Sequence, residues 1–151
     1  MIYHFYIYMM TDQSTLNRFT EAQQADYEPA LAEIKNGLKR GHWMWYIFPQ
    51  IQGLGFSQTS RFYAIKDKEE AIAYLNHPVL GERLINISNE LLKLAISNAH
   101  AIFGSPDDLK LRSCMTLFAA LPNTDPVFEA VLEKFFGGAG DETTLEILNK
   151  I

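Results

Sequence analysis

The segment from His42 to Gln50 limits what this chain can fold into more than any other part of the sequence. Its central residues, Trp43 to Phe48, are all aromatic or apolar. A strand or helix built from such a run has no face for solvent, so we expect it to be buried on all sides. The polar residues at its ends, His42 and Gln50, then need hydrogen-bond partners, because unpaired polar groups are costly to bury. The segment therefore predicts either core or the lining of a ligand site.

The length and composition predict one domain with a core of its own. The chain has 151 residues, of which 48% are hydrophobic and 21% are charged. At this length, about two-thirds of the surface of the unfolded chain can be removed from water. Cys114 is the only cysteine, so no disulfide can form within the chain, and no secretory signal pattern is recognised. We expect a soluble, cytoplasmic protein.

The first ten residues are mostly apolar, but a bilayer span takes about 20 residues, so this run is too short to cross a membrane. We predict that residues 1–11 are an N-terminal extension, in the form of a short strand or a docked arm. Residues 12–151 are predicted to form a single helical domain. No membrane partner is expected.

The charge balance argues against nucleic acid as a partner. The chain has 13 basic and 18 acidic residues, a net charge of -5, whereas binding to a phosphate backbone depends on clustered basic groups. The four histidines stand apart and paired cysteines are absent, so we predict no metal site and no cofactor. The oligomeric state does not follow from the sequence.

Polar caps, prolines and apolar residues at helical spacing predict a mainly α fold, a single compact multi-helix domain. Asp26, Ser105 and Asp125 are the expected caps ahead of a proline, and Asp67 and Asp141 are the expected caps of two shorter helices. Helices are expected over residues 16–22, 27–38, 68–76, 80–94, 106–121, 126–136 and 142–151. Strand patterns are weak and occur only at residues 2–8 and 61–65.

Two segments combine apolar bulk with polar donors, the mixture expected of a ligand pocket. The candidate ligand-binding residues of the first segment are Lys39, His42, Trp43, Trp45, Gln50 and Ser57. Those of the second segment are Lys110, Arg112, Ser113 and Thr116. The candidates for a general acid or base are His42, the weak candidate for a catalytic residue, and Asp107, Asp108 or Asp141, and the sequence does not place them within reach of one another.

Plainer interpretations exist for parts of these segments. Asp108 and Arg112 lie four residues apart and can pair on a solvated helix face. Cys114 falls on the apolar side of the same helix, which favours a buried structural thiol over a nucleophile. The glycines before Ser57 lack the third glycine of a dinucleotide fingerprint, since Gln58 stands in its place. We expect Ser57 to cap a short helix instead.

A series of motifs runs in a distinctive order along the chain. They are Arg18-Phe19, Ala22-Gln23, Tyr27, Lys39, His42 through Gln50, Gly53-Leu54-Gly55, Ser57, Tyr63, His77-Pro78-Val79-Leu80-Gly81, Arg83-Leu84, Ile102-Phe103-Gly104, Asp107-Asp108, Lys110-Leu111-Arg112-Ser113 and Met115-Thr116-Leu117-Phe118. In this order the chain resembles the family catalogued as domain of unknown function 1810, from about Leu16 to Leu148.

The resemblance implies a predominantly helical single domain and no established activity. Members of this family have sometimes carried a calpastatin-like label. Calpain inhibitors of that type are disordered polar chains, whereas this chain is rich in aromatic residues and patterned for a core. The family pattern has serine where this chain has Cys114, which weakens a cysteine nucleophile further.

Two functions remain open from the sequence. The first is a small-molecule binding domain for a nucleotide-like or other anionic ligand, either as a binding protein or as a hydrolase or transferase. The second is a non-catalytic protein–protein interaction module, in which the aromatic residues form core or a partner surface. Whether the protein is an enzyme stays undecided at this point.

Overall fold

A computed structural model describes residues 2–150 of the chain, and the side chains of residues 15–150. The mainly α prediction is confirmed, because nine helices and no strand form within residues 2–150. The helices are α1 (Ile2–Lys35), α2 (Met44–Ile47), α3 (Gln58–Tyr63), α4 (Lys68–Asn76), α5 (Leu80–Lys93), α6 (Ala99–Phe103), α7 (Asp107–Ala119), α8 (Val127–Phe136) and α9 (Glu142–Lys150). Of these described helices, none is both long and apolar enough to span a bilayer.

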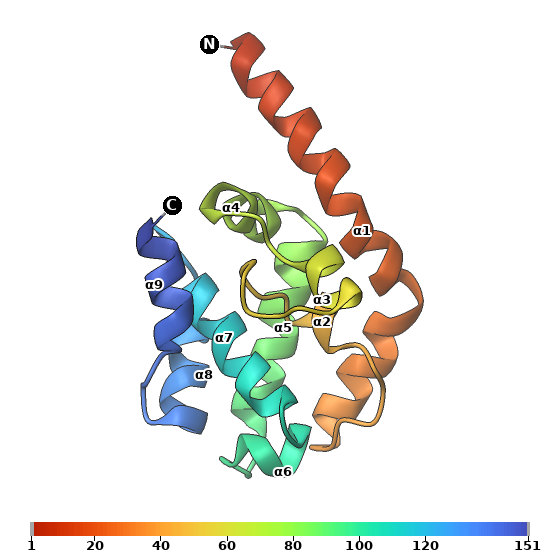
Figure 1. Ribbon diagram of the computed structural model, residues 1–151. Coiled ribbons are helices and arrows are strands. Elements are labelled where there is room, and N and C mark those ends of the chain that lie inside the picture. The colour runs from red at the N-terminus through yellow and green to blue at the C-terminus, as the bar shows by residue number, and fades with distance from the viewer. Residues whose placement is uncertain (1, 151) are drawn as a thin grey trace.

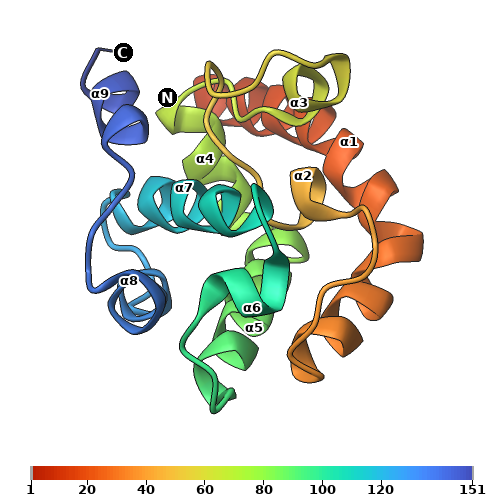
Figure 2. The ribbon, with the colours of Figure 1, turned by 60° about the horizontal axis from the view of Figure 1, so that its bottom comes forward.

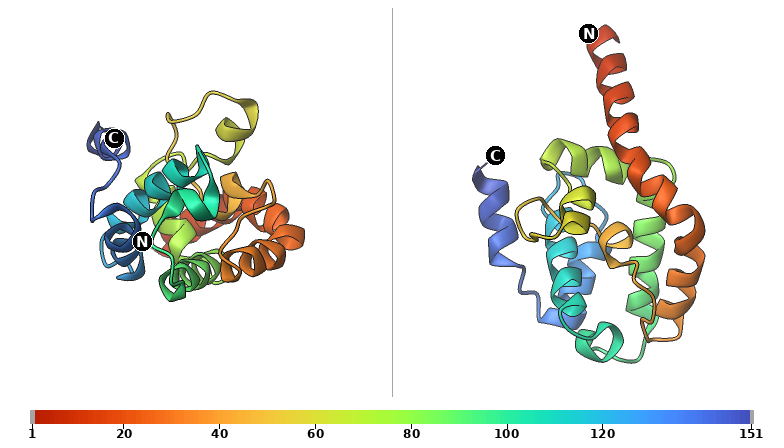
Figure 3. Two further views of the ribbon diagram at one scale, coloured as in Figure 1. Left: turned by 90° about the horizontal axis from the view of Figure 1, so that it is seen from below. Right: turned by 45° about the vertical axis from the view of Figure 1, so that its right-hand side comes forward.

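Helix α5 is the centre of the packing. It contacts α1, α4 and α8, while α7 contacts α4, α6, α8 and α9. Figure 3 shows α1 lying beside α5, and Figure 1 shows α7 in front of it. The apolar residues of α5 recur at helical spacing, with Leu80, Leu84, Ile87 and Leu91 all at most 1% exposed. That stripe is the one expected from the sequence, and it forms the middle of a single hydrophobic core.

Helix α1 differs from the prediction at both of its expected boundaries. Residues 2–8, for which a strand or arm was predicted, are helical and continuous with the rest of α1, so the strand prediction is wrong. That part of α1 extends away from the remaining helices in Figure 1. The extension boundary after residue 11 stays a prediction.

Pro29 lies inside α1, so the helix start predicted after Asp26 is also wrong. Proline inside a helix removes one N–H donor and favours a bend, but it does not force the helix to end when both flanks are packed. Ala30 and Ile34 follow Pro29 and are fully buried, which holds the last turns of α1 against the core. The ribbon changes direction along this helix in Figure 1. The Asp26 carboxylate instead accepts a hydrogen bond from the Tyr46 hydroxyl.

Most local helix signals are confirmed. Asp67 caps α4 by accepting from Glu70 N at 2.9 Å, and Asp141 caps α9 by accepting from Thr144 N at 2.9 Å. Ser57 caps α3 by accepting from Ser60 N at 3.1 Å, so residues 61–63 are helical and not extended.

Three further local features are the starts of α7 and α8 and an isolated β-bridge. Ser105 does not cap α7, since the capping position is Pro106 and no side chain bonds there. Asp125 does accept from Val127 N, at 2.8 Å, at the start of α8. Residue 65 makes an isolated parallel bridge to Ile51, which joins the segment after α2 to the segment after α3.

Candidate functional site

The aromatic segment is mostly core. Trp43, Met44, Ile47 and Phe48 are at most 3% exposed, whereas Trp45 and Tyr46 are half-buried. The short helix α2 explains the split, because four residues of helix turn Trp45 away from Met44 and Ile47. The Tyr46 hydroxyl is already bonded to Asp26, and Trp45 is the aromatic residue of this segment that lines a pocket.

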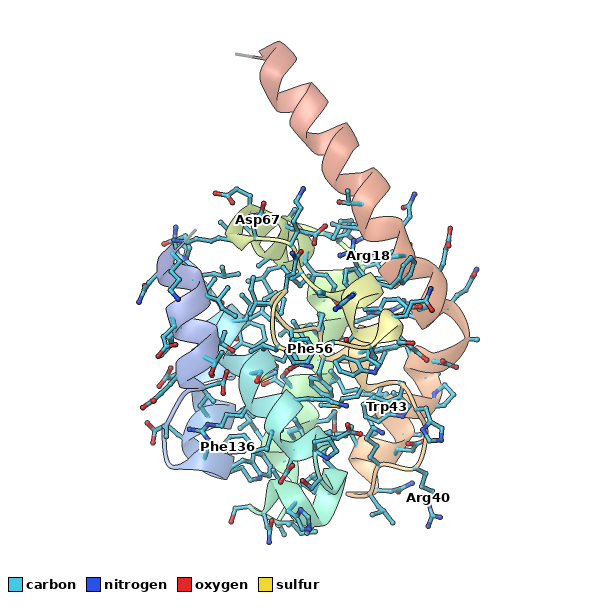
Figure 4. The ribbon with its side chains drawn as sticks, viewed as in Figure 1. Arg18, Arg40, Trp43, Phe56, Asp67 and Phe136 are labelled. Carbon is cyan, nitrogen blue, oxygen red and sulfur yellow. The ribbon has the colours of Figure 1, made fainter. Side chains whose placement is uncertain are left out.

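Glu33 of α1 fixes the loop that leads into α2. Its Oε1 accepts three hydrogen bonds, from Arg40 N at 2.7 Å, Gly41 N at 2.9 Å and Trp43 Nε1 at 2.9 Å. Burial raises the pKa of Glu33, but these hydrogen bonds outweigh it and hold the pKa below the ordinary value. In Figure 4, Trp43 lies toward the interior and Arg40 at the periphery. Trp43 thus has a structural partner for its indole N–H.

A chain of charges runs from this loop to α7. The Lys39 ammonium lies 2.8 Å from Asp107 Oδ2, and the Lys110 ammonium lies 3.0 Å from Asp107 Oδ1. Lys39 also lies over the Trp43 ring, 5.0 Å from its centroid, and Lys110 over the Trp45 ring, 4.0 Å from its centroid. Two ammonium groups share one carboxylate, so this cluster keeps one net positive charge.

The electrostatics of Asp107 follow from the same contacts. Burial alone would raise the pKa of Asp107, but the hydrogen bonds and charges of Lys39 and Lys110 hold it below the ordinary value. The carboxylate therefore stays ionised at neutral pH. It orients both ammonium groups, one toward each tryptophan.

A pocket of about 330 Å³ lies beside α7, and we call it the α7 pocket. This volume is within the range of small-molecule sites. Figure 2 shows α7 with the approach to α9 on one side and α2 on the other. The lining comes from the segment around α2, from α7 and from the start of α9: Trp45, Gln50, Leu54, Gly55, Pro106, Leu109, Lys110, Ser113, Asp141 and Thr143.

Gln50 lies in the wall of the α7 pocket with an unsatisfied amide. Gln50 is 8% exposed, and its side-chain Nε2 is buried without a hydrogen-bond partner among the described residues. Its backbone is held independently, since Gln50 O accepts from Ile65 N at 2.8 Å. One donor in a residue of the pocket lining is thus not used by the fold.

Asp141 is the acidic residue in the lining of the α7 pocket. Thr116 Oγ1 accepts from Asp141 N at 2.8 Å, which places Asp141 beside the last turns of α7. Lys110 and Thr116 are six residues apart on α7, a rise of about 9 Å at 1.5 Å per residue. The lining of the α7 pocket therefore includes both the ammonium of Lys110 and the carboxylate of Asp141.

The structure brings together four of the ten candidate residues, Trp45, Gln50, Lys110 and Ser113, in the lining of the α7 pocket. Lys39 adjoins them through Asp107. The remaining candidates, Trp43, His42, Ser57, Arg112 and Thr116, are not in this lining.

The five candidate residues outside the pocket lining lie elsewhere in the structure, where they have other contacts or are exposed. His42 is exposed, and Ser57 is exposed while it caps α3. Arg112 donates to the carbonyls of Ala139 at 3.0 Å and Gly140 at 2.9 Å, so it fastens the loop before α9. The predicted pair between Asp108 and Arg112 does not form, because Asp108 lies 3.5 Å from the His100 imidazole instead. Thr116 serves as a hydrogen-bond bridge between α7 and Asp141.

Asp141 and Leu109 belong to the site but were not among the candidates. Asp141 was expected as a helix cap or as an acid–base candidate, and Leu109 was not singled out. The spacing of Leu109, Lys110 and Ser113 along one helix could have placed them near each other. Nothing in the local sequence joins Asp141 to them, since that contact depends on Thr116 and the turn after α8.

Cys114 does not line the α7 pocket, and its surroundings favour a structural role. Cys114 is fully buried, and burial raises its pKa well above the ordinary value, which agrees with a structural thiol. Within the described residues, no group of three or more His, Cys, Asp or Glu side chains is placed to hold a metal ion.

Comparison with known proteins extends this description to a family. The model of the family described as "Protein of unknown function (DUF1810)" matches residues 13–148. The chain belongs to this family. No curated protein matches the chain.

A solved structure shares the DUF1810 fold. The crystal structure of the conserved hypothetical protein Rv1873 from Mycobacterium tuberculosis is similar, with a TM-score of 0.87 and 44% sequence identity. The match covers 89% of this chain and 96% of that protein. This likeness supports the fold of the family and assigns no activity.

Proposed function

We propose that this domain binds a small anionic molecule in the α7 pocket. The observation that carries the proposal is the amide of Gln50, which is buried beside the pocket without a partner. An unsatisfied buried polar group costs about 1–3 kcal/mol. Gln50 can recover this cost when its amide turns into the pocket and donates to a ligand that accepts a hydrogen bond there.

The position of Lys110 sets the charge of the proposed ligand. Its ammonium reaches the pocket over the face of Trp45, and the cluster with Lys39 and Asp107 has one excess positive charge. A phosphate or carboxylate group near Lys110 would neutralise that excess. The exposed apolar Leu109, also in the lining, offers contact to a less polar part of the ligand.

The geometry supports binding more than a reaction. His42, the weak acid–base candidate, is exposed and outside the lining of the pocket. Asp141 is the only carboxylate of the lining in the described chain, and one of its oxygens already caps α9. A cytoplasmic location and a role as hydrolase or transferase stay predictions from the sequence.

A panel of nucleotides and sugar phosphates, screened by thermal shift on the full chain, tests the proposal. A ligand at a hundredfold its dissociation constant should add about 2.7 kcal/mol to the free energy of unfolding. For a domain of this size, that corresponds to a rise in Tm of about 5–10 °C. Lys110→Gln should reduce the shift, whereas Lys93→Gln, at an exposed lysine of α5, should not.

Gln50→Met separates a binding role from a structural one. Methionine has a similar volume and no amide, so the free protein should be as stable as wild type or more stable, because the unsatisfied donor is gone. The ligand-induced shift should fall at the same time. A less stable Gln50→Met protein with an unchanged ligand shift would assign Gln50 to the fold and count against the pocket.

A second candidate is a protein–protein interaction module, and the exposure of Phe56 favours it. Phe56 is 81% exposed and Phe62 is 57% exposed, and Phe56 lies on the face turned to the viewer in Figure 4. Exposed aromatic residues of this size often mark partner surfaces. Binding of a small anion that survives Phe56→Ser unchanged, together with loss of it in Lys110→Gln, favours the first candidate.

A further inference from the structure

We infer that Asp141 selects the ligand of the α7 pocket, and that this ligand is a phosphate ester of a sugar. The inference rests on the proposed function. It adds a second recognition group to the pocket and narrows the ligand from any small anion to a molecule with an anionic group and hydroxyl donors.

The first observation is the free oxygen of Asp141. Its Oδ2 accepts from Thr144 N at 2.9 Å and from Thr144 Oγ1 at 2.6 Å. Its Oδ1 accepts no hydrogen bond among the described residues, and the residue lines the pocket. A carboxylate oxygen accepts hydrogen bonds only, so the ligand group that meets it must be a donor, such as a hydroxyl or an amine.

The second observation is that Asp141 is held in place before any ligand binds. Its backbone N–H is fixed by Thr116, and the carbonyls of Ala139 and Gly140 just before it are gripped by Arg112. The side chain is fixed by the two bonds from Thr144. Preorganised acceptors lose little freedom on binding, which favours recognition of a specific donor.

The third observation is the separation of the two charges. Lys110 and Asp141 both line the pocket, and Thr116, which binds Asp141 N, comes six residues after Lys110, a rise of about 9 Å along α7. A lone phosphate or carboxylate would meet the ammonium but would also be repelled by the Asp141 carboxylate. A sugar phosphate carries an anionic group that can meet Lys110 and hydroxyl donors that can meet Asp141, so one molecule can satisfy both charges of the lining.

Calorimetric titration of the full chain with four compounds tests the inference. They are ribose 5-phosphate, adenosine monophosphate, inorganic phosphate and ribose. We expect the two phosphate esters to bind more tightly than inorganic phosphate or ribose by about tenfold or more, since each charge-assisted hydrogen bond contributes on that scale. Comparison of the dissociation constants of adenosine monophosphate and ribose 5-phosphate shows whether a nucleobase adds affinity.

Asp141→Asn is the decisive variant. Asparagine caps helices as well as aspartate, so α9 should remain intact, and the apo Tm checks this. We expect about a tenfold loss of affinity for ribose 5-phosphate but an unchanged or higher affinity for inorganic phosphate, because a repelling charge is removed. Lys110→Gln should weaken both. Asp141→Ser, which also caps, serves if the first variant is unstable.

The outcomes separate the inference from the proposed function. Opposite responses of ribose 5-phosphate and inorganic phosphate to Asp141→Asn support the inference. Equal responses, or binding of inorganic phosphate as tight as that of the esters in wild type, overturn it and leave the anion site standing. If none of the anions binds wild type, the proposed function fails and the inference with it.

Discussion

The indole N–H of Trp43 and the carboxylate of Glu33 lie 2.9 Å apart and join the first helix to the aromatic segment. The same oxygen of Glu33 accepts from two backbone N–H groups of the loop between them. The loop has no helix or strand of its own, and the Glu33 carboxylate accepts backbone hydrogen bonds that a helix or strand would otherwise satisfy. It also positions Lys39, which reaches from that loop to Asp107.

Replacement of Glu33 should therefore destabilise the whole domain. Glu33→Ala leaves three N–H donors without their acceptor, and we expect a loss of about 2–3 kcal/mol in the free energy of unfolding, since unpaired donors cost about 1–3 kcal/mol. Glu33→Gln keeps an acceptor oxygen and should lose less. Urea denaturation of both variants measures the difference. Equal losses in both would show that the charge, and not the acceptor geometry, stabilises the loop.

Gly81 permits a close approach between α4, with the backbone of Leu75, and α5. A Cβ on residue 81 would lie 1.9 Å from the carbonyl oxygen of Leu75, which is backbone and cannot rotate away. Glycine to alanine inside a helix usually stabilises by about 1 kcal/mol. Here we expect the opposite sign, a loss of about 1–3 kcal/mol from overpacking.

The control variant is Glu82→Ala, because Glu82 is the next residue of α5 and is exposed. The latter should change the free energy of unfolding by less than about 0.5 kcal/mol. Thermal denaturation followed by circular dichroism gives both values. A Gly81→Ala protein as stable as wild type would mean that α4 and α5 do not approach as closely as described.

Signals that act within a few residues were sufficient to predict most helices. Asp67 and Asp141 lie just before their helices and cap them with their own side chains. Gly137 ends α8 in the left-handed conformation, with φ 62°, as a glycine there predicts. These features need no partner from elsewhere in the chain, which is why sequence alone identifies them.

Features that depend on packing escaped prediction. Pro29 is a stop signal locally, yet α1 continues through it because Tyr27 before it and Ala30 after it are buried against the core. The short helices α2 and α6 have too few residues to show a period. An apolar N-terminal run of residues 2–8 matched a strand pattern, but its pairing with other strands, on which a strand depends, is not found in the described chain.

The candidate site was half predictable for the same reason. Lys110 and Ser113 are three residues apart and share a helix face, whereas Arg112 is two residues from Lys110 and points about 200° away around the helix. Grouping residues by donor type put Arg112 in the pocket, but helical geometry sends it to the carbonyls of Ala139 and Gly140. Of the two polar ends of the aromatic segment, Gln50 is buried without a partner for its Nε2, as a buried polar end was expected to matter, whereas His42 is exposed and the same expectation was wrong for it.

The thiol of Cys114 should be unreactive in the native protein. It is fully buried and burial raises its pKa, so little thiolate is formed and reagents cannot reach it. We expect modification by a disulfide reagent only at the rate of unfolding, with complete reaction in urea as the control. Rapid reaction of the native protein would show that α7 opens locally or that the thiol is less buried than described.

Acid should destabilise this domain through its paired carboxylates. The pKa of Asp107 and that of Glu70 are both lower than the ordinary values, in each case because hydrogen bonds to cations outweigh burial; Glu70 is paired with Arg18 at 2.9 Å. Arg18 lies where α1 passes the rest of the fold in Figure 4. A carboxyl with a lowered folded-state pKa adds stability above its unfolded pKa, about 4, and this stability is lost as the pH falls through the folded-state value.

The free energy of unfolding should therefore be level from about pH 7 to pH 5 and fall steeply below about pH 4, as the unfolded state takes up more protons than the folded state. Asp107→Asn should be less stable than wild type at pH 7 and show a shallower fall, because one proton-linked carboxyl is gone. Glu82→Gln, at an exposed carboxyl of α5, should retain the wild-type slope. Urea titrations between pH 7 and pH 2.5 measure all three. A slope in Asp107→Asn equal to that of wild type would mean that the link between Lys39, Asp107 and Lys110 adds nothing to the folded state, and that the ammonium beside Trp45 is held by packing alone.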